Sequence, residues 1–432
     1  MLRPLLVDQG KMKTEALPHN QRSLRILQIF SRYLQPGGEE RFAELFSSAL
    51  SPQHRVENYI GSTHDLLGSG GLKRLISPFL ALHNPRVDHD LRALQKQKNF
   101  DVWVVQNTLP GLSPAVYRVA QSLNIPIVHY LHNFRLSCAN GFFLNHGSPC
   151  ERCLQGNFWP AFQTACWRDS RWISGWMGLL LRRVRSLGTF QFVRAWVALN
   201  EQQRQKHVQM GIPKNRIHVI PHFFTSANQP PDHAPAGDVL FLGRLSPEKG
   251  LDLLLQAWKQ VRQDGRVLRI AGTGPAESYL RNMASSLNLA NVEFLGFVSR
   301  DRHPELWRQA AFSVIPSTWN EPFPLSFLES WSQQRAPVAS RLGAMAENIS
   351  DGQDGLLVEP FSATSLAVAI QSLIDQPDRA IRMGFAGRQK VISRFNRDLW
   401  TQRINHVFTV ALSADSPPPA QSCIGEGGPA SL

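Results

Sequence analysis

The sequence predicts an α/β protein with two domains, and three observations support this prediction. The chain has 432 residues, which is too many for one compact hydrophobic core. Short apolar segments alternate with segments of helical periodicity along most of its length, a pattern typical of parallel α/β sheets. A polar stretch with several prolines, residues 223–237, interrupts this alternation near the middle, and we interpret it as an interdomain linker.

Strands are predicted on both sides of the linker, and several are wholly apolar, as expected for strands buried on both faces. In the first half they span residues 24–30, 56–61, 100–106, 125–130, 195–199 and 218–221. In the second half they span residues 239–242, 267–271, 292–297, 312–316, 337–340 and 355–358. Helices are expected to begin near Lys249, Pro275, Pro304, Pro324, Ala344 and Ser362, and two further helices span 379–395 and 399–412.

These elements give a first domain at residues 22–222, a second at 238–395 and a last helix at 396–412. Residues 1–21 lack the apolar core of a signal peptide and are expected to be a disordered lead-in. Residues 413–432, rich in Ser, Pro and Gly, are expected to be a disordered tail. Since no apolar run reaches the length of a membrane-spanning helix, we expect a cytoplasmic protein.

The net charge of +13 is concentrated in the first half of the chain. Residues 1–230 carry 27 Lys and Arg against 13 Asp and Glu, whereas residues 231–432 carry 19 against 20. A nucleotide diphosphate would account for a few of these cations, and an anionic membrane surface with a lipid-linked acceptor for more. A merely solvated basic surface is the alternative. Nucleic acid is not expected as a partner, since its recognition motifs are absent.

Four cysteines fall within one short segment, residues 138–166, which we expect to be an insert in the first domain. Cys150 and Cys153 form a C-x2-C pair, with Cys138 and Cys166 on either side. Tetrahedral thiolate ligation of a structural zinc ion is one interpretation. Free structural thiols and redox chemistry are the alternatives, and disulfides are disfavoured without an export signal.

The segment after this insert has an amphipathic pattern with tryptophans. On a helix one face would hold Trp172, Trp176, Leu179, Leu180, Val184 and Leu187. Arg182, Arg183 and Arg185 would crowd the other side. Such a helix can lie in a membrane interface or cover a domain core.

Two carboxylates eight residues apart mark the candidate site in the second half. Glu321 follows a buried strand, and Glu329 lies inside the helix that begins after Pro322 and Pro324. This arrangement can hold a polyhydroxyl ligand beside a helix N-terminus, and two ordinary solvated acids are the alternative.

Five segments of the second half resemble glycosyltransferase family 4 in their order and spacing. They are residues 241–250 (FLGRLSPEKG), 268–275 (LRIAGTGP), 320–330 (NEPFPLSFLES), 343–349 (GAMAENI) and 354–358 (DGLLV). The resemblance covers residues 239–360 and is looser in the first half, at 35–39 (QPGGE) and 129–133 (HYLHN). It implies a GT-B fold of two Rossmann-like domains facing across a cleft, with the last helix crossing back. The cysteine insert is similar to that of some capsule and exopolysaccharide members.

The resemblance implies roles for residues of the second half. Arg244 and Lys249 would stabilise the leaving diphosphate, as paired cations can. Glu321 would contact the donor sugar and Glu329 the ribose hydroxyls. The backbone of Phe323, Pro324 and Leu325 would reach the diphosphate, while Gly272 and Gly274 would dock the base or simply form a turn. Glu347 would have an indirect or structural role.

In the first half, Gly37 and Gly38 would let backbone N–H groups approach a phosphate, although such a pair is also common in turns. His132, preferred to His129, would face the donor sugar; a buried structural histidine is the alternative. The family usually has an aspartate where this chain has Asn133. A D-x-D triplet at Asp88 and Asp90 could suggest a metal site, but it lies far from the donor elements.

We therefore expect a retaining, metal-independent glycosyltransferase that needs no cofactor for catalysis. It would move a hexose from a UDP- or GDP-sugar to a saccharide or lipid-linked saccharide in cell-surface polysaccharide synthesis, peripherally on the cytoplasmic face of the membrane. A GT-B sugar-nucleotide epimerase is the alternative enzyme, but no acid–base pair for elimination is evident. A catalytically silent sugar-nucleotide-binding scaffold and a nucleic-acid-binding module are the alternatives from other classes.

Overall fold

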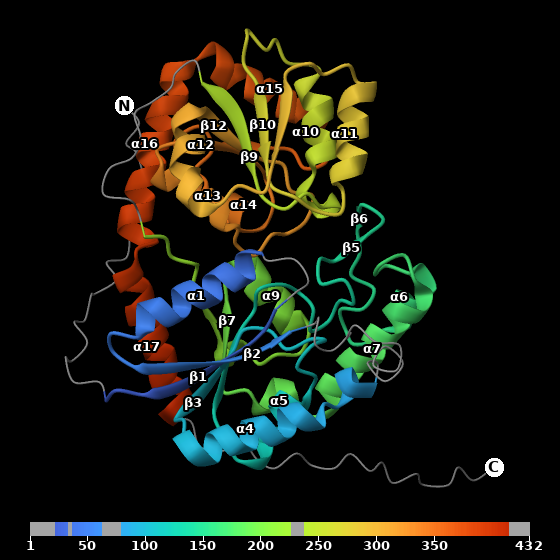
Figure 1. The fold of residues 1–432 in the computed structure, drawn as a ribbon, viewed down its shortest axis with the longest axis vertical. Coiled ribbons are helices and arrows are strands. Elements are labelled where there is room, and N and C mark those ends of the chain that lie inside the picture. Colours follow the sequence, from blue (N-terminus) through green and yellow to red (C-terminus); the bar gives the residue numbers. More distant parts are fainter. Residues whose placement is uncertain (1–21, 33–36, 63–78, 226–236, 414–432) are drawn as a thin grey trace, which may run out of the picture.

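The computed structural model describes residues 22–32, 37–62, 79–225 and 237–413. The predicted lead-in, nearly all of the predicted tail and most of the predicted linker lie outside these residues. Two six-stranded parallel sheets form the centres of two domains, with helices packed around each (Figure 1). The predicted doubly wound α/β fold is confirmed.

The first sheet has the strand order β2-β1-β3-β4-β7-β8. Its strands are β1 (Arg25–Arg32), β2 (Arg55–Ser62), β3 (Val102–Val105), β4 (Ile127–Tyr130), β7 (Ala195–Ala198) and β8 (Ile217–Val219). The second sheet has the order β11-β10-β9-β12-β13-β14. Its strands are β9 (Asp238–Leu242), β10 (Leu268–Ala271), β11 (Val292–Gly296), β12 (Ala310–Ile315), β13 (Ala336–Ser340) and β14 (Leu356–Val358). Each of them overlaps a strand predicted from the sequence.

The helices follow the strands, as expected of parallel sheets. Those of the first domain are α1 (Gly38–Leu50), α4 (Pro85–Lys98), α5 (Ala115–Ser122), α6 (Trp159–Thr164), α7 (Arg171–Ser186), α8 (Thr189–Phe192), α9 (Glu201–Gln209) and the 3-10 turn η1 (Lys214–Arg216). Those after the linker are η2 (Pro247–Lys249), α10 (Leu251–Trp258), α11 (Glu277–Ser286), η3 (Arg300–Arg302), α12 (His303–Gln309), α13 (Leu325–Ser332), α14 (Gly343–Asn348), α15 (Ala363–Asp375), α16 (Pro377–Arg394) and α17 (Arg397–Ser413).

The cysteine insert contains a small feature that the sequence did not predict. Strands β5 (Leu144–Asn145) and β6 (Ser148–Pro149) form a short antiparallel ribbon. Its tight turn includes Gly147, whose φ of +79° favours glycine. Helix α6 follows this ribbon and packs against α7.

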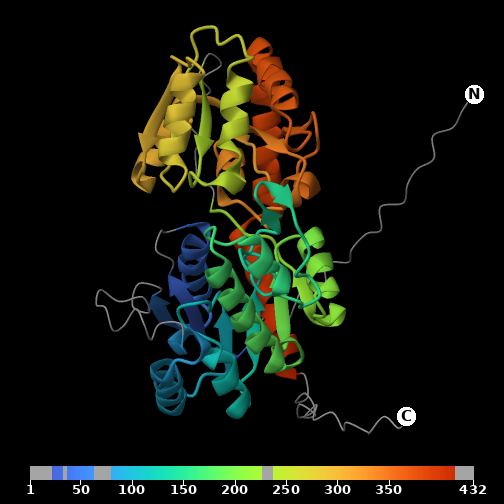
Figure 2. The same ribbon diagram turned by 90° about the vertical axis from the view of Figure 1, so that its right-hand side faces the viewer.

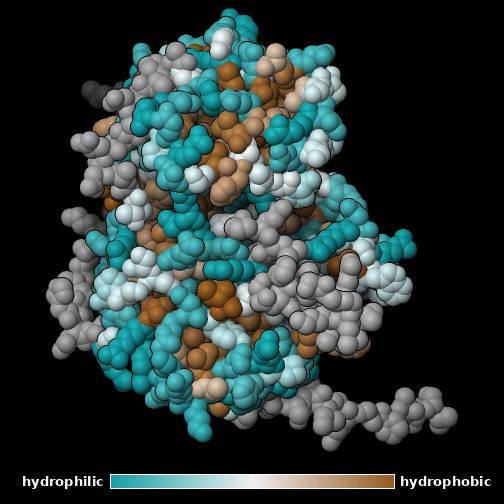
Figure 3. Space-filling view, viewed as in Figure 1, coloured by the Kyte–Doolittle hydropathy of each residue, from teal (hydrophilic) through white to brown (hydrophobic). Residues whose placement is uncertain are grey.

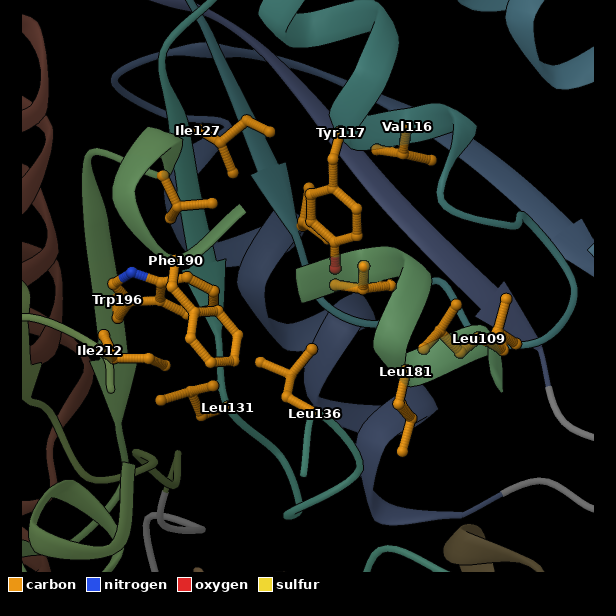
Figure 4. Packing of buried hydrophobic residues seen from close by; sticks show 14 of the residues in the cluster. Leu109, Val116, Tyr117, Ile127, Leu131, Leu136, Leu181, Phe190, Trp196 and Ile212 are labelled. Carbon is orange, nitrogen blue, oxygen red and sulfur yellow. The ribbon is translucent and has the colours of Figure 1, made fainter. Parts of the chain in front are cut away.

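The core of the first domain is built by buried strands and the helices over them. Every residue of β3, β4 and β7 is buried. Ile127 of β4 and Trp196 of β7 pack with Tyr117 of α5 and Leu181 of α7 (Figure 4). One face of α7 is therefore part of this core.

The last helix, α17, returns to the first domain. Trp400, Ile404 and Phe408 pack in one cluster with Phe42 and Phe46 of α1. The Arg397 guanidinium donates to the backbone carbonyls of α1, and the Asn405 side chain contacts His54 at 2.9 Å. Figure 2 shows this red helix running beside the first domain. The chain therefore contributes its last helix to its first domain.

The surface seen from the side of Figure 1 is mostly hydrophilic, with separate hydrophobic patches between the polar side chains (Figure 3). Within the described residues, none of the helices combines the length and the apolar character that spanning a membrane requires.

Candidate active site

Loops that follow the strands of both sheets meet where the two domains contact each other. Asn200 caps α9 and donates a hydrogen bond of 2.7 Å to the carbonyl of Pro322. Trp319 packs edge-to-face on Phe142 of the cysteine insert, with ring centroids 4.9 Å apart. The loop that carries Glu321 therefore lies against the first domain.

Lys249 and Glu321 are brought together by two loops of the second domain. Lys249 ends η2, and the backbone N–H of Thr318 donates to the carbonyl of Glu248 at 3.0 Å, which joins these loops. The Lys249 ammonium pairs with Glu321 Oε1, while the Ser317 hydroxyl donates to Oε2 at 2.6 Å. Glu321 is only 4% exposed, so these two partners supply the hydrogen bonds that water would otherwise give its carboxylate.

Arg244 lies on the other side of η2 and is held by an acid that the sequence analysis missed. Its guanidinium donates to Glu248 Oε1 at 2.8 Å, and Ser246 donates to the same oxygen at 2.6 Å. Burial alone would raise the pKa of Glu248, but the charges of Arg244 and Lys249 and the Ser246 hydrogen bond lower it. Glu248 therefore stays ionised between the two cations. Its position between Arg244 and Lys249 in the sequence is the signal that could have identified it.

Gly272 and Gly274 pack against the Arg244 loop. A Cβ on Gly272 would lie 1.9 Å from the carbonyl oxygen of Gly243, and one on Gly274 would lie 2.2 Å from that of Leu245. The Leu245 N–H donates to the Thr273 carbonyl at 2.9 Å. This close approach of two backbones accounts for both glycines by turn geometry, one of the two interpretations left open by the sequence.

Glu329 lies in the middle of α13 and is held by α12. Its Oε1 lies 2.5 Å from His303 Nδ1 and accepts from Trp307 Nε1 at 3.1 Å. Burial lowers the pKa of His303, but the hydrogen bond and charge of Glu329 raise it more, so the net shift is upward. His303 and Trp307 were missed, because their link to Glu329 is made only when α12 and α13 pack together.

The N-terminus of α13 offers fewer backbone donors than the sequence suggested. Pro324 precedes the helix and has no N–H, so it cannot contact a phosphate as a donor. Phe323 and Leu325 keep their N–H groups. The Phe323 ring lies 5.9 Å from the ring of His222 in the first domain.

His132 follows β4 and is 8% exposed. Its Nε2 lies 2.7 Å from Gln106 Oε1, and Gln106 donates its own amide to Gln28 at 3.0 Å. This amide orientation makes His132 Nε2 the donor and leaves Nδ1 as an acceptor. Burial lowers the pKa of His132 despite the opposing charge of Glu39, so the ring is neutral near pH 7.

His129 has a different environment from His132. Its Nδ1 lies 2.8 Å from the Tyr130 carbonyl and its Nε2 lies 2.9 Å from the Tyr117 hydroxyl. Its ring stacks on Trp196 at 4.9 Å, and burial lowers its pKa to about 3. Both ring nitrogens are thus used inside the first domain, whereas His132 keeps one available.

Glu39 is a second acid that the sequence analysis missed. Its two carboxylate oxygens accept from the side-chain amides of Asn107 at 2.9 Å and Asn133 at 2.8 Å. Asn107, Asn133 and His132 also line a small cavity of about 30 Å³ at the ends of β3 and β4. Asn133 therefore serves as a donor to Glu39.

Gly37 and Gly38 stand at the start of α1, beside Glu39. Neither has left-handed backbone geometry, and a Cβ on either would have no atom within 4 Å among the described residues. The packing of the described chain therefore does not require glycine here. Open space above these two residues fits the predicted approach of a ligand to the backbone.

Glu347 crosses between the domains. Its carboxylate accepts from the backbone N–H groups of Glu201 at 2.8 Å and Gln202 at 2.6 Å, at the start of α9. A carboxylate at a helix N-terminus is favourable for both hydrogen bonding and charge. The expected structural role of Glu347 is thus an interdomain contact.

The four cysteines of the insert have free thiols. Burial, followed by the charges of the other three cysteines, raises the pKa of Cys153 to about 12. Across the described part of the chain, no three or more His, Cys, Asp and Glu side chains are arranged to hold a metal ion. The structure gives no support to zinc at Cys138, Cys150, Cys153 and Cys166, which stays a prediction.

The D-x-D triplet is part of α4, capped by Asn84. Asp88 pairs with Arg92 and Arg118, whereas Asp90 accepts from Tyr59 at 3.2 Å. The two acids therefore have separate structural partners.

The predicted division of α7 into an apolar and a basic face is wrong. Leu180 and Val184 are buried in the core, whereas Trp172 and Leu179 point outward and are 80% and 53% exposed. Arg185 is not on a solvated face, because it donates to Ser137, Leu154 and Met210. The helical periodicity of the sequence shows that α7 has a broad apolar face, but it does not show which half of that face the core covers.

Two family models match adjoining parts of the chain. Glycosyltransferase Family 4 matches residues 36–225, and Glycosyl transferases group 1 matches residues 228–390. An exopolysaccharide phosphotransferase of Streptomyces coelicolor is 32% identical over 232 residues, 52% of this chain and 24% of that protein. Glycogen synthase of Mycobacterium tuberculosis is 28% identical over 269 residues, 59% of this chain and 63% of that protein. The matches thus span less than two thirds of either relative.

The fold matches that of Anabaena HepE, solved in complex with UDP and glucose. The TM-score is 0.65 at 18% identity, covering 89% of this chain and 99% of that chain. Two Rossmann-like domains with the loops described above therefore define a GT-B protein. The chain belongs to glycosyltransferase family 4.

Proposed function

We propose that this protein is a retaining hexosyltransferase that uses a nucleotide-diphosphate sugar. The observation that carries the proposal is the convergence of two cations, Arg244 and Lys249, with two buried acids, Glu248 and Glu321, on adjoining loops. A diphosphate leaving group needs such cations, and a sugar needs acceptors such as Glu321. Transfer would be metal-independent, because the two cations supply the charge that a metal ion would otherwise supply.

The proposed step is a front-face displacement. The bond from the sugar's anomeric carbon to the phosphate oxygen breaks as a bond to the acceptor hydroxyl oxygen forms on the same face. The acceptor's proton passes to the leaving phosphate. Glu321 and neutral His132 would orient the sugar, and Glu329 would accept from the ribose hydroxyls.

The proposed setting is cell-surface polysaccharide synthesis. The complexes with UDP and UDP-glucose among the structural neighbours support a UDP-sugar donor, and a GDP-sugar is the alternative. The exopolysaccharide relative supports a saccharide or lipid-linked acceptor. Free cysteines suit the reducing cytoplasm, so we place the enzyme at the cytoplasmic face of the membrane.

A screen of UDP-, GDP- and ADP-sugars by thermal shift and nucleotide release tests this proposal. One donor should raise the melting temperature of the wild type and be slowly hydrolysed. Glu329→Ala and Lys249→Ala should lose both effects. The donor should no longer raise the melting temperature of either variant, and neither variant should release nucleotide from it. The matched control Lys259→Ala, at an exposed site after α10, should keep them. A wild type that no nucleotide stabilises would refute the donor site.

A further inference from the structure

The helical hairpin of α6 and α7 carries an apolar surface that the core does not use. Trp159 and Trp172 are 61% and 80% exposed, and Ile173 and Leu179 are 38% and 53% exposed. We define this set, with Phe162, as the hairpin patch. Its members come from two helices that pack on each other at the outer side of the first domain (Figure 1).

The aromatic rings of the hairpin patch form a continuous series. Trp159 stacks on Phe162 with centroids 5.0 Å apart, and Phe162 contacts Trp172 edge-to-face at 5.6 Å. Leu179 follows Trp172 by seven residues and so continues the series along the same side of α7. The rings support one another, yet the outer tryptophans remain in water.

Exposure here is not a by-product of packing the domain. The core-facing side of α7 is already complete with Met177, Leu180, Leu181 and Val184, all at 0% exposure. Large aromatic side chains in water are unfavourable, and contiguous exposed patches mark interaction sites. The patch is therefore suited to a partner with an apolar region.

The helices that carry the patch are rich in positive charge. Residues 159–186 contain five arginines and one acid, Asp169. Arg171, Arg182 and Arg183 are exposed, and Arg183 lies four residues beyond Leu179 on the same stripe. The partner must therefore combine an apolar layer with negative charge.

We infer that the hairpin patch docks on an anionic phospholipid bilayer. Tryptophans favour the interfacial depth of a membrane, and arginines beside them would contact lipid phosphates. A second copy of the chain fits less well, since a two-fold contact would bring arginines against arginines. Single-stranded nucleic acid would suit the rings, but Ile173 and Leu179 have no ring on which a base could stack.

This inference deepens the membrane-side role in the proposed function, and it can fail independently of the donor chemistry. The full-length protein is sedimented with vesicles of phosphatidylcholine, with or without phosphatidylglycerol. The wild type should bind the mixed vesicles, and added salt should weaken binding. Trp172→Ser with Leu179→Ser should reduce affinity at least about tenfold. Arg182→Gln with Arg183→Gln should remove most of the preference for phosphatidylglycerol.

Two controls separate the possible outcomes. Phe385→Ser, at a 54% exposed aromatic of α16, should bind vesicles like the wild type. Lys249→Ala should also bind them while losing the donor effect. Equal binding by the Trp172→Ser, Leu179→Ser variant would overturn the inference. So would a concentration-dependent dimer that this variant abolishes, or polyuridylate binding at the patch without vesicle binding.

Discussion

Lys249 and Glu321 form an ion pair although 72 residues separate them in the sequence. Glu321 is almost fully buried, and its second oxygen is taken by Ser317. A diphosphate that binds Lys249 must therefore interact with an ammonium that is already paired with this carboxylate. The cation is therefore held in place before a donor arrives, which reduces the cost of ordering it on binding.

The pair predicts an asymmetry between single and double substitution. Lys249→Met would leave a buried carboxylate with only the Ser317 hydroxyl, and we expect a loss of about 3 kcal/mol in the free energy of unfolding. Adding Glu321→Gln removes the unpaired charge and should recover most of that loss without restoring activity. Urea denaturation measures the free energy of unfolding of the single and the double variant. A double variant as unstable as the single one would contradict this account.

The His303–Glu329 pair predicts a pH-dependent stability. The pKa of His303 in the folded protein is raised above its ordinary value of 6.5. The contribution of the pair to the free energy of unfolding should thus be complete below pH 6.5. It should be lost as the pH rises through the raised pKa of His303. Thermal unfolding of the wild type and His303→Gln across pH measures it. The difference in melting temperature should shrink on the alkaline side, and a difference that grows there would refute the pairing.

Glu347 predicts an effect on domain association. Glu347→Ala removes two hydrogen bonds from the start of α9 and should cost about 1 kcal/mol. Glu347→Gln keeps one acceptor oxygen but loses the charge, so its stability should lie between those of the wild type and Glu347→Ala. Small-angle scattering should show a larger radius of gyration for Glu347→Ala. An unchanged radius with unchanged stability would mean that the contact is incidental.

Two glycine substitutions should have opposite effects. Gly274→Ala forces a Cβ into the Leu245 backbone, so we expect impaired folding or a markedly lower melting temperature. Gly38→Ala places its Cβ in open space within a helix and should keep or slightly raise stability. If the backbone of Gly38 approaches a phosphate of the donor, Gly38→Ala should also raise the KM for the donor while the protein stays stable. Comparing melting temperatures with KM values distinguishes the two roles.

The predicted zinc ion can be measured directly. Protein purified without added metal should contain one zinc per chain, and Cys153→Ser should lose it. Metal-free protein whose insert thiols all react with a thiol reagent would contradict the zinc prediction.

The sequence predicted every strand of the two parallel sheets, because buried parallel strands are short apolar runs, a local property. It also singled out Lys249, Glu321 and Glu329 by motif as candidate site residues, but not their partners. Glu39, Gln106 and His303 acquire their contacts only through the packing of distant segments. The orientation of α7 was wrong for a related reason. Its apolar face is wider than the core surface beneath it, and only the fold decides that Leu180 is covered and Trp172 is not.

The return of α17 to the first domain has a consequence for how the protein is made. Trp400, Ile404 and Phe408 complete an apolar layer whose other side is α1, formed near the beginning of synthesis. While the second domain is being translated, the ribosome holds a first domain with that layer still bare. The nascent chain therefore exposes this apolar layer until α17 has been made, and exposed apolar surface of this kind is prone to aggregation.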